Sequence, residues 1–144
     1  MSKLCSKESF FDLIKDDIDL KSFKNISYIE KVEEQIEKIE SFKNLKENWD
    51  SYGAEKVNED CIKRAISIVN FFKNRSLGIN FSYPLPDGGI QLEMNNSYNL
   101  EIEVNPNGFN DQIIITDESG TILWEFEEPK LNAENLNKVI SFYF

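Results

Sequence analysis

The spacing of apolar residues changes once along this chain of 144 residues, and that change limits the possible fold more than any other feature. Up to about residue 79, apolar residues recur every three or four positions, which is the spacing of one face of a helix. From Ile90 to Phe126 they alternate with polar residues, as in a strand that buries one side. Helices followed by strands are typical of an α+β domain.

Apolar stripes predict three helices before the sheet and one after it. The first covers about residues 6–20, the second begins near Ser27 and ends at Phe42 or Leu45, the third covers about 58–74, and the last covers residues 131–143. Asn58 and Asn132 are suited to cap the third and fourth helices. In the third helix we expect five residues to face inward: Ile62, Ala65, Ile66, Val69 and Phe72. We therefore predict a single domain over 1–144, mainly helical over 1–79, with an antiparallel sheet over 80–128 and a C-terminal helix.

The parity of the inward residues predicts how the strands pair. In the first hairpin the inward residues of both strands are even-numbered, so the numbers of two residues that lie opposite each other must sum to an even number. The loop must then have an odd number of residues, and a three-residue loop at 95–97 would place Leu92 opposite Leu100. In the second hairpin the inward residues are odd-numbered on one strand and even-numbered on the other, so the loop must have an even number of residues. A two-residue loop at Ser119-Gly120 would pair Ile113 with Phe126 and Ile115 with Trp124. With residues 79–83 as an edge strand before Pro84, the sheet is a meander of four or five strands, packed on one face by helices.

Charge and composition exclude several classes of function. The chain has 16 basic and 26 acidic residues, no His and two Cys, and its net charge is −10. The lack of His excludes catalytic sites in which an imidazole activates a nucleophile, and it excludes zinc sites built on imidazole. The negative net charge argues against direct binding to nucleic acid. No signal peptide or membrane-spanning stretch is evident, so we expect a cytoplasmic protein that does not contact a membrane.

The negative charge is concentrated on one predicted face of the sheet. Residues 80–144 contain 11 acids and two bases, Lys130 and Lys138. The predicted outer face carries these acidic and apolar residues: Glu93, Glu101, Glu103, Ile114, Leu123, Glu125 and Glu127. A solvated face that keeps the protein soluble is one interpretation. A surface that attracts a basic partner around an apolar contact is the other.

The segment 47–54 places two aromatic residues beside a glycine between two helices. We expect Trp49 and Tyr52 to fill the core while Asp50 or Asn48 caps nearby backbone N–H groups. The alternative is a recognition loop with Trp49, Asp50 and Tyr52 as anchors.

Pro86-Asp87, followed later by Glu101-Ile102-Glu103, resembles the PD-(D/E)xK nuclease motif. The resemblance implies that Asp87, Glu101 and Glu103 would lie near a magnesium ion. In that family a lysine helps to activate the attacking water. Glu103 stands in the place of that lysine here, which is a departure from the chemistry of the family.

Residues 48–54 (NWDSYGA), with 87–93 (DGGIQLE) and 100–103 (LEIE), form a second pattern. It resembles a group of small bacterial and phage-borne proteins that have an NWDxYGA segment and a later DGGxQLE strand pair. The resemblance implies an intracellular protein of bacterial or phage origin. It implies no activity, cofactor or catalytic residue.

Together these features predict a non-enzymatic acidic protein that binds a basic protein partner through its sheet face and needs no cofactor. An antitoxin, an immunity protein or an anti-defence inhibitor would have this character. Two alternatives remain open: a carboxylate-metal hydrolase that uses Asp87, Glu101 and Glu103, and a small-ligand binder with a pocket under the 47–54 segment.

Overall fold

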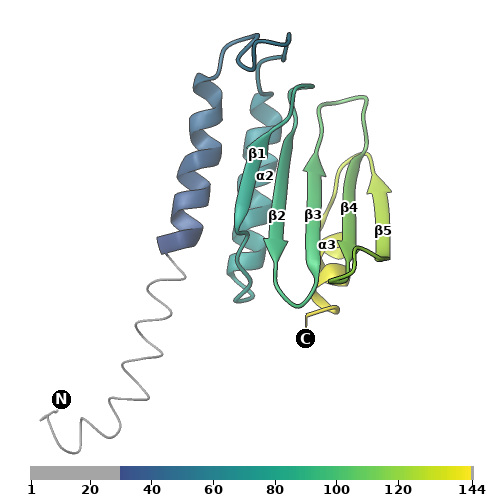
Figure 1. The fold of residues 1–144 in the computed structure, drawn as a ribbon. Helices are drawn as coiled ribbons and strands as arrows, with labels where there is room; N and C mark the ends of the chain where they lie inside the picture. Colours follow the sequence, from purple (N-terminus) through teal and green to yellow (C-terminus); the bar gives the residue numbers. More distant parts are fainter. Residues whose placement is uncertain (1–29, 144) are drawn as a thin grey trace, which may run out of the picture. The chain divides into compact units, whose positions relative to one another are not determined.

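The computed structural model describes residues 30–143 (Figure 1). The chain divides into two compact units, residues 1–31 and 32–144, and almost all described residues belong to the second. The helix predicted over residues 6–20 lies outside the described residues.

In the described part of the chain, two α-helices precede the sheet and one follows it. A helix whose described part covers residues 30–41 leads into the short 3-10 helix η1 (Phe42–Asn44). Helix α2 (Glu59–Lys73) comes next, and α3 (Ala133–Ile140) follows the sheet. None of these helices is long and apolar enough to cross a bilayer.

Both predicted N-caps are confirmed. The side chain of Asn58 accepts the N–H of Cys61 at the start of α2. Asn132 and Asn135 bond each other's backbone N–H groups at the start of α3, which is a reciprocal capping box. One inward residue of α2 was predicted wrongly, because Ile68 is buried and Ile66 is only half-buried.

The sheet is an antiparallel five-stranded meander in the order β1-β2-β3-β4-β5. The strands are β1 (Phe81–Pro84), β2 (Ile90–Asn95), β3 (Asn99–Val104), β4 (Asp111–Thr116) and β5 (Ile122–Glu128). The predicted edge strand is therefore present as β1 and ends at Pro84. Proline suits this position because it has no N–H for a sheet ladder.

The register of the first hairpin differs from the prediction by two residues. Leu92 lies opposite Ile102, not Leu100, and the loop is residues 96–98. The parity holds, so every side chain stays on its predicted face. Tyr98 belongs to the loop because its ring packs edge-on against Phe142 and Tyr143, and its carbonyl accepts the Tyr143 hydroxyl. Contacts with the C-terminus therefore favour the longer hairpin.

The second hairpin has the predicted pairs but a different loop. Ile113 lies opposite Phe126 and Ile115 opposite Trp124. Beyond them Thr116 pairs with Ile122, so Leu123 is the extra residue of a β-bulge. The loop between this last pair is residues 117–121, and Gly120 within it has a φ of 87°, which suits glycine.

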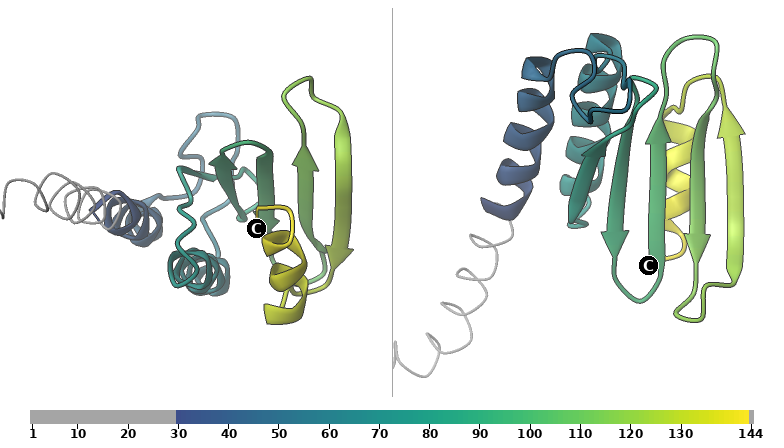
Figure 2. Two further views of the ribbon diagram at one scale, coloured as in Figure 1. Left: turned by 90° about the horizontal axis from the view of Figure 1, so that it is seen from below. Right: turned by 45° about the horizontal axis from the view of Figure 1, so that its top comes forward.

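The core lies between the sheet and the helices. Figure 2 (left) shows α2 and α3 on the same side of the sheet, and no helix of residues 30–143 covers the other side. Ile90, Leu92, Leu100, Ile102 and Ile113 are completely buried on the helix side, and Val69 and Phe72 are buried on α2. The opposite side of the sheet is called the outer face below.

Candidate functional site

Two rows of side chains cross the outer face, because residues that lie opposite each other on one pair of strands continue in line onto the next strand. The first row runs through Phe81, Glu93, Glu101, Ile114 and Glu125. The second runs through Tyr83, Gln91, Glu103, Gln112 and Glu127. All five glutamates predicted for this face are therefore on it. We call these two rows the acidic face.

Strand β4 separates the glutamates into two groups. Glu93, Glu101 and Glu103 lie on β2 and β3, whereas Glu125 and Glu127 lie on β5. Ile114 stands between them, directly opposite both Glu101 and Glu125. Neighbouring strands are about 4.8 Å apart, so an apolar side chain lies between carboxylates close enough to contact the same partner.

The glutamates of the acidic face have no cationic partner in the described part of the chain, and Lys38 lies over the Tyr83 ring at the β1 margin of the face. None of its five glutamates takes part in an ion pair among residues 30–143, and the five strands contain no Lys or Arg. Neutral amides bond three of the carboxylates instead. Gln91 donates to Glu93 at 2.6 Å, Gln112 to Glu127 at 3.1 Å and Asn105 to Glu103 at 3.4 Å.

Glu101 is the residue on which the repulsion acts most clearly. It lies directly opposite Glu93 on β2 and two residues before Glu103. Partial burial raises the pKa of Glu101, and the charges of Glu93 and Glu103 raise it further. Like charges directly opposite each other destabilise a sheet. The face therefore holds unrelieved negative charge that a cation would neutralise.

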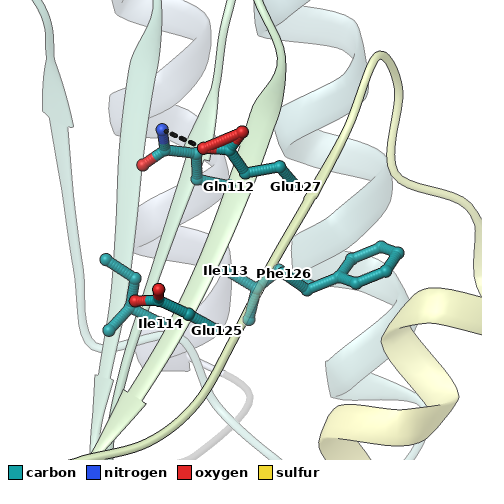
Figure 3. Close-up of a pocket in the computed structure, with 6 residues that line it drawn as sticks. All are labelled: Gln112, Ile113, Ile114, Glu125, Phe126 and Glu127. Atoms are coloured by element: carbon teal, nitrogen blue, oxygen red, sulfur yellow. Dashed lines mark hydrogen bonds between the residues drawn. The ribbon is translucent and has the colours of Figure 1, made fainter.

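A hollow of about 220 Å³ lies on β4 and β5 (Figure 3). It is lined by Gln112, Ile113, Ile114, Glu125, Phe126 and Glu127. In Figure 3 the side chains of Ile114 and Glu125 lie together on one side of the strands, and Phe126 points the other way, towards α3. The hollow therefore places a carboxylate beside the apolar side chain at the centre of the acidic face.

Apolar side chains are exposed at both margins of the sheet. Phe81 and Tyr83 on β1 are 42% and 40% exposed, and their rings stack at 6.4 Å between centroids. On β5, Ile122 is 53% exposed, and Leu123, in the bulge, is 42% exposed. Exposed apolar residues next to charged ones are common in protein interfaces.

The segment 47–54 is a loop folded on its own hydrogen bonds. One oxygen of Asp50 accepts the N–H groups of Tyr52 and Ala54, and Asn48 accepts that of Gly53. The Trp49 indole donates to the carbonyl of Glu55 at 3.1 Å. Trp49 and Asp50 are half-buried, whereas Tyr52 is 91% exposed. The expectation that both aromatic side chains fill the core is therefore wrong for Tyr52.

This loop is joined to the turn that contains Asp87. The Glu55 N–H donates to the carbonyl of Pro86 at 2.8 Å, and the Asn58 N–H donates to that of Gly88 at 2.9 Å. The residues just after the 48–54 segment thus contact the turn at the start of the 87–93 segment. Their shared role is to hold the 45–58 connection against the start of β2.

The three carboxylates of the nuclease-like pattern do not form a metal-binding group. Among residues 30–143, no three His, Cys, Asp or Glu side chains are arranged to hold a metal ion. Asp87 accepts the N–H of Gly89 in its turn at 2.9 Å, whereas Glu101 and Glu103 are on the acidic face.

Sequence reasoning missed a buried polar network that connects α2 with the sheet. Arg64 donates to Asp111, which is completely buried, and to the carbonyl of Asn105. Asp111 also accepts the N–H groups of Asn105 and Leu131. The alternation along β4 indicates that Asp111 is buried, because it shares the inward-facing, odd-numbered positions with Ile113 and Ile115. An acid on the buried side of a strand requires a partner.

Cys61 is buried next to this network, and burial disfavours its reactive thiolate form. Its pKa is raised to about 11, mainly because burial disfavours the thiolate. The helix N-terminus on which it lies does not offset that effect. Cys61 therefore has a packing role.

Comparisons with protein-family models, with curated proteins and with solved structures find no match for this chain. The function proposed below therefore depends on the geometry of the described residues.

Proposed function

We propose that the protein binds a basic protein partner through its acidic face. The observation that carries the proposal is the pair of cross-strand rows, in which five glutamates have no cationic partner among residues 30–143 and Ile114 lies between Glu101 and Glu125. If the face served only to keep the protein soluble, a mixture of acidic and basic residues would be more favourable, because opposite charges on neighbouring strands attract and would relieve the repulsion between the glutamates.

The arrangement suits a partner that presents Lys or Arg around an apolar side chain. The glutamates would attract such a partner over a distance and accelerate its association. Ile114 and the hollow beside it would provide the desolvated contact at the centre. Binding would also remove the repulsion that acts on Glu101, so part of the association free energy would come from relief of strain in the free protein.

A small acidic protein that occupies a basic surface would block whatever that surface does. We therefore propose an inhibitory role, as an antitoxin, an immunity protein or an anti-defence inhibitor. The blocked surface would be the basic substrate groove of an enzyme. On this proposal the protein itself needs no catalytic residue and no cofactor.

The test is capture of the partner from host lysate by tagged variants. In the first variant Glu101, Glu103 and Glu125 are changed to Lys. In the matched control three exposed glutamates away from the acidic face, Glu47, Glu55 and Glu118, are changed to Lys, so the net charge shifts equally. Thermal unfolding of both variants establishes that they are folded.

We expect the wild type and the control to retain one basic protein in a fixed ratio, with retention that weakens as salt rises. The variant with the altered acidic face should lose that protein. Equal retention by both variants would show that the acidic face is not the binding surface.

A further inference from the structure

The two edges of the sheet differ in how far they are protected from further pairing. Strand β1 has four residues and ends in Pro84. Its Ser82 hydroxyl donates to Gln35 of the 30–41 helix, and Lys38 of that helix lies over the Tyr83 ring. A short strand, a proline and covering side chains are the usual protection of a sheet edge.

Strand β5 lacks most of this protection. It has seven residues and contains neither Pro nor Lys, and in Figures 1 and 2 no element from the described part of the chain lies beyond it. The bulge at Leu123 affects only its beginning, so Trp124 to Glu128 is regular. Alternate N–H and C=O groups of an edge strand point away from its neighbour. Among residues 30–143, no hydrogen bond joins the β5 backbone to an element other than β4.

The side chains of β5 determine what kind of strand could pair there. Glu125 and Glu127 face outward, in the rows of the acidic face. Trp124 and Phe126 face the helix side, where they stack at 5.7 Å between ring centroids and remain half-buried. An added strand would therefore need cations on one side and apolar residues on the other.

A second copy of this chain does not satisfy that requirement. Pairing two β5 strands would bring glutamates of both copies together on the outer side, and like charges across strands are unfavourable. The charge of β5 thus acts against self-association and favours a basic segment.

We propose that an extended segment with alternating basic and apolar residues adds to the edge of β5 as a sixth strand. This inference rests on the proposed function, because it names the part of the basic partner that the acidic face receives. Main-chain hydrogen bonds would supply affinity, and the alternating side chains would supply specificity. Glu125 and Glu127 would pair with the basic residues, and Trp124 and Phe126 would contact the apolar ones.

The test uses a synthetic peptide of alternating Lys and Val, matched in length to β5. Its control is the same peptide N-methylated along the whole backbone, which keeps the charge but cannot donate to a strand. Binding to the full-length protein is followed by NMR titration and by hydrogen exchange of the β5 amides. The protein variants are Glu125→Lys with Glu127→Lys, and, as a matched control on β3, Glu101→Lys with Glu103→Lys.

We expect the unmodified peptide to bind and to slow the exchange of alternate β5 amides. N-methylation should weaken binding by about tenfold or more, which corresponds to about 1.4 kcal/mol. The β5 variant should weaken it by a similar factor, and the β3 variant should weaken it less.

Equal binding of both peptides, or unchanged exchange at β5, would overturn strand addition. Loss of the natural partner from the Glu101, Glu103 and Glu125 variant would then still support the acidic face as a charge-based surface. Protection of alternate β5 amides in the free protein, rising with its concentration, would identify a second copy as the occupant and would also overturn the inference.

Discussion

Nη1 of Arg64 lies 2.5 Å from Oδ2 of Asp111 and joins the middle of α2 to the first residue of β4. The carboxylate is completely buried, and the Arg64 side chain is 17% exposed. Arg64 also pairs with Asp60 at 2.9 Å, one turn earlier on α2. The same guanidinium thus has one buried and one solvent-facing carboxylate, which provides an internal comparison.

Changing Asp111 to Ala should destabilise the protein by about 3–5 kcal/mol, because a largely buried guanidinium loses its buried carboxylate and keeps only the solvent-facing Asp60 and the Asn105 carbonyl as acceptors. It also removes the acceptor of the Asn105 and Leu131 N–H groups. Asp60→Ala is the control, with an expected loss below about 1 kcal/mol, because Asp60 is 46% exposed. Urea unfolding measures both. Similar losses for the two variants would contradict the importance of the buried pair.

Glu101 should make stability depend on pH in a direction opposite to that of an ordinary paired acid. Folding raises its pKa, so the protonated form is favoured in the folded state. Its stabilising contribution is present below the unfolded pKa and is lost as pH rises through the folded pKa. We expect Glu101→Gln to be as stable as the wild type near pH 3 and more stable at pH 7, by less than about 1 kcal/mol.

Denaturant unfolding across that pH range checks the Glu101 prediction. Glu118→Gln, in the exposed loop between β4 and β5, is the matched control and should follow the wild type at every pH. If the difference in unfolding free energy between Glu101→Gln and the wild type stayed the same at every pH, the Glu101 carboxylate would not be subject to repulsion in the folded protein.

Gly89 should not tolerate a side chain, although its backbone has ordinary angles. A Cβ there would lie 2.7 Å from the carbonyl oxygen of Val104 and 2.8 Å from Oδ1 of Asn105. Because the first contact is with backbone, we expect Gly89→Ala to cost about 1–3 kcal/mol. Gly53→Ala is the comparison, since Gly53 has open space but a φ of 87°, and should cost about 1–2 kcal/mol through backbone strain alone.

The two Gly variants are distinguished by their structural effects. Gly89→Ala should shift the NMR signals of Val104 and Asn105, whereas Gly53→Ala should affect only its own loop. An unperturbed β3 in Gly89→Ala would contradict the close approach seen here.

Tyr52 and Asp50, two residues apart, should respond in opposite ways to substitution. Tyr52 is almost fully exposed, so Tyr52→Ala should change the free energy of unfolding by less than about 0.5 kcal/mol. Asp50 accepts two N–H groups of the loop, so Asp50→Ala should cost about 1–2 kcal/mol. Thermal unfolding measures both. A large loss in Tyr52→Ala would mean that the ring packs where this structure leaves it exposed.

Hydrophobic periodicity was sufficient to predict the sheet and the face on which each glutamate lies. Period-two alternation does not depend on loop length, so Glu101 and Glu103 kept their face although the hairpin register moved by two residues. The register itself depended on Tyr98 packing against Tyr143 near the C-terminus, a long-range contact that no local pattern contains.

The polar network around Asp111 was harder to predict for a similar reason. Arg64 looks like an ordinary solvent-facing residue of an amphipathic helix, and Asp111 looks like part of a turn. Their pairing over 47 positions follows from the placement of α2 against β4.

The two hydrogen bonds between the 45–58 connection and the Pro86–Gly88 turn carry a further consequence for how this sequence can change over generations. Each segment presents backbone to the other, and a Cβ on Gly88, whose φ is 93°, would lie 3.2 Å from the carbonyl oxygen of Lys56. An insertion or a bulky replacement in one segment should therefore be accepted only together with a matching change in the other. Among descendants of this chain, the two segments should be inherited or lost as one unit, even when the acidic face diverges to suit a different partner.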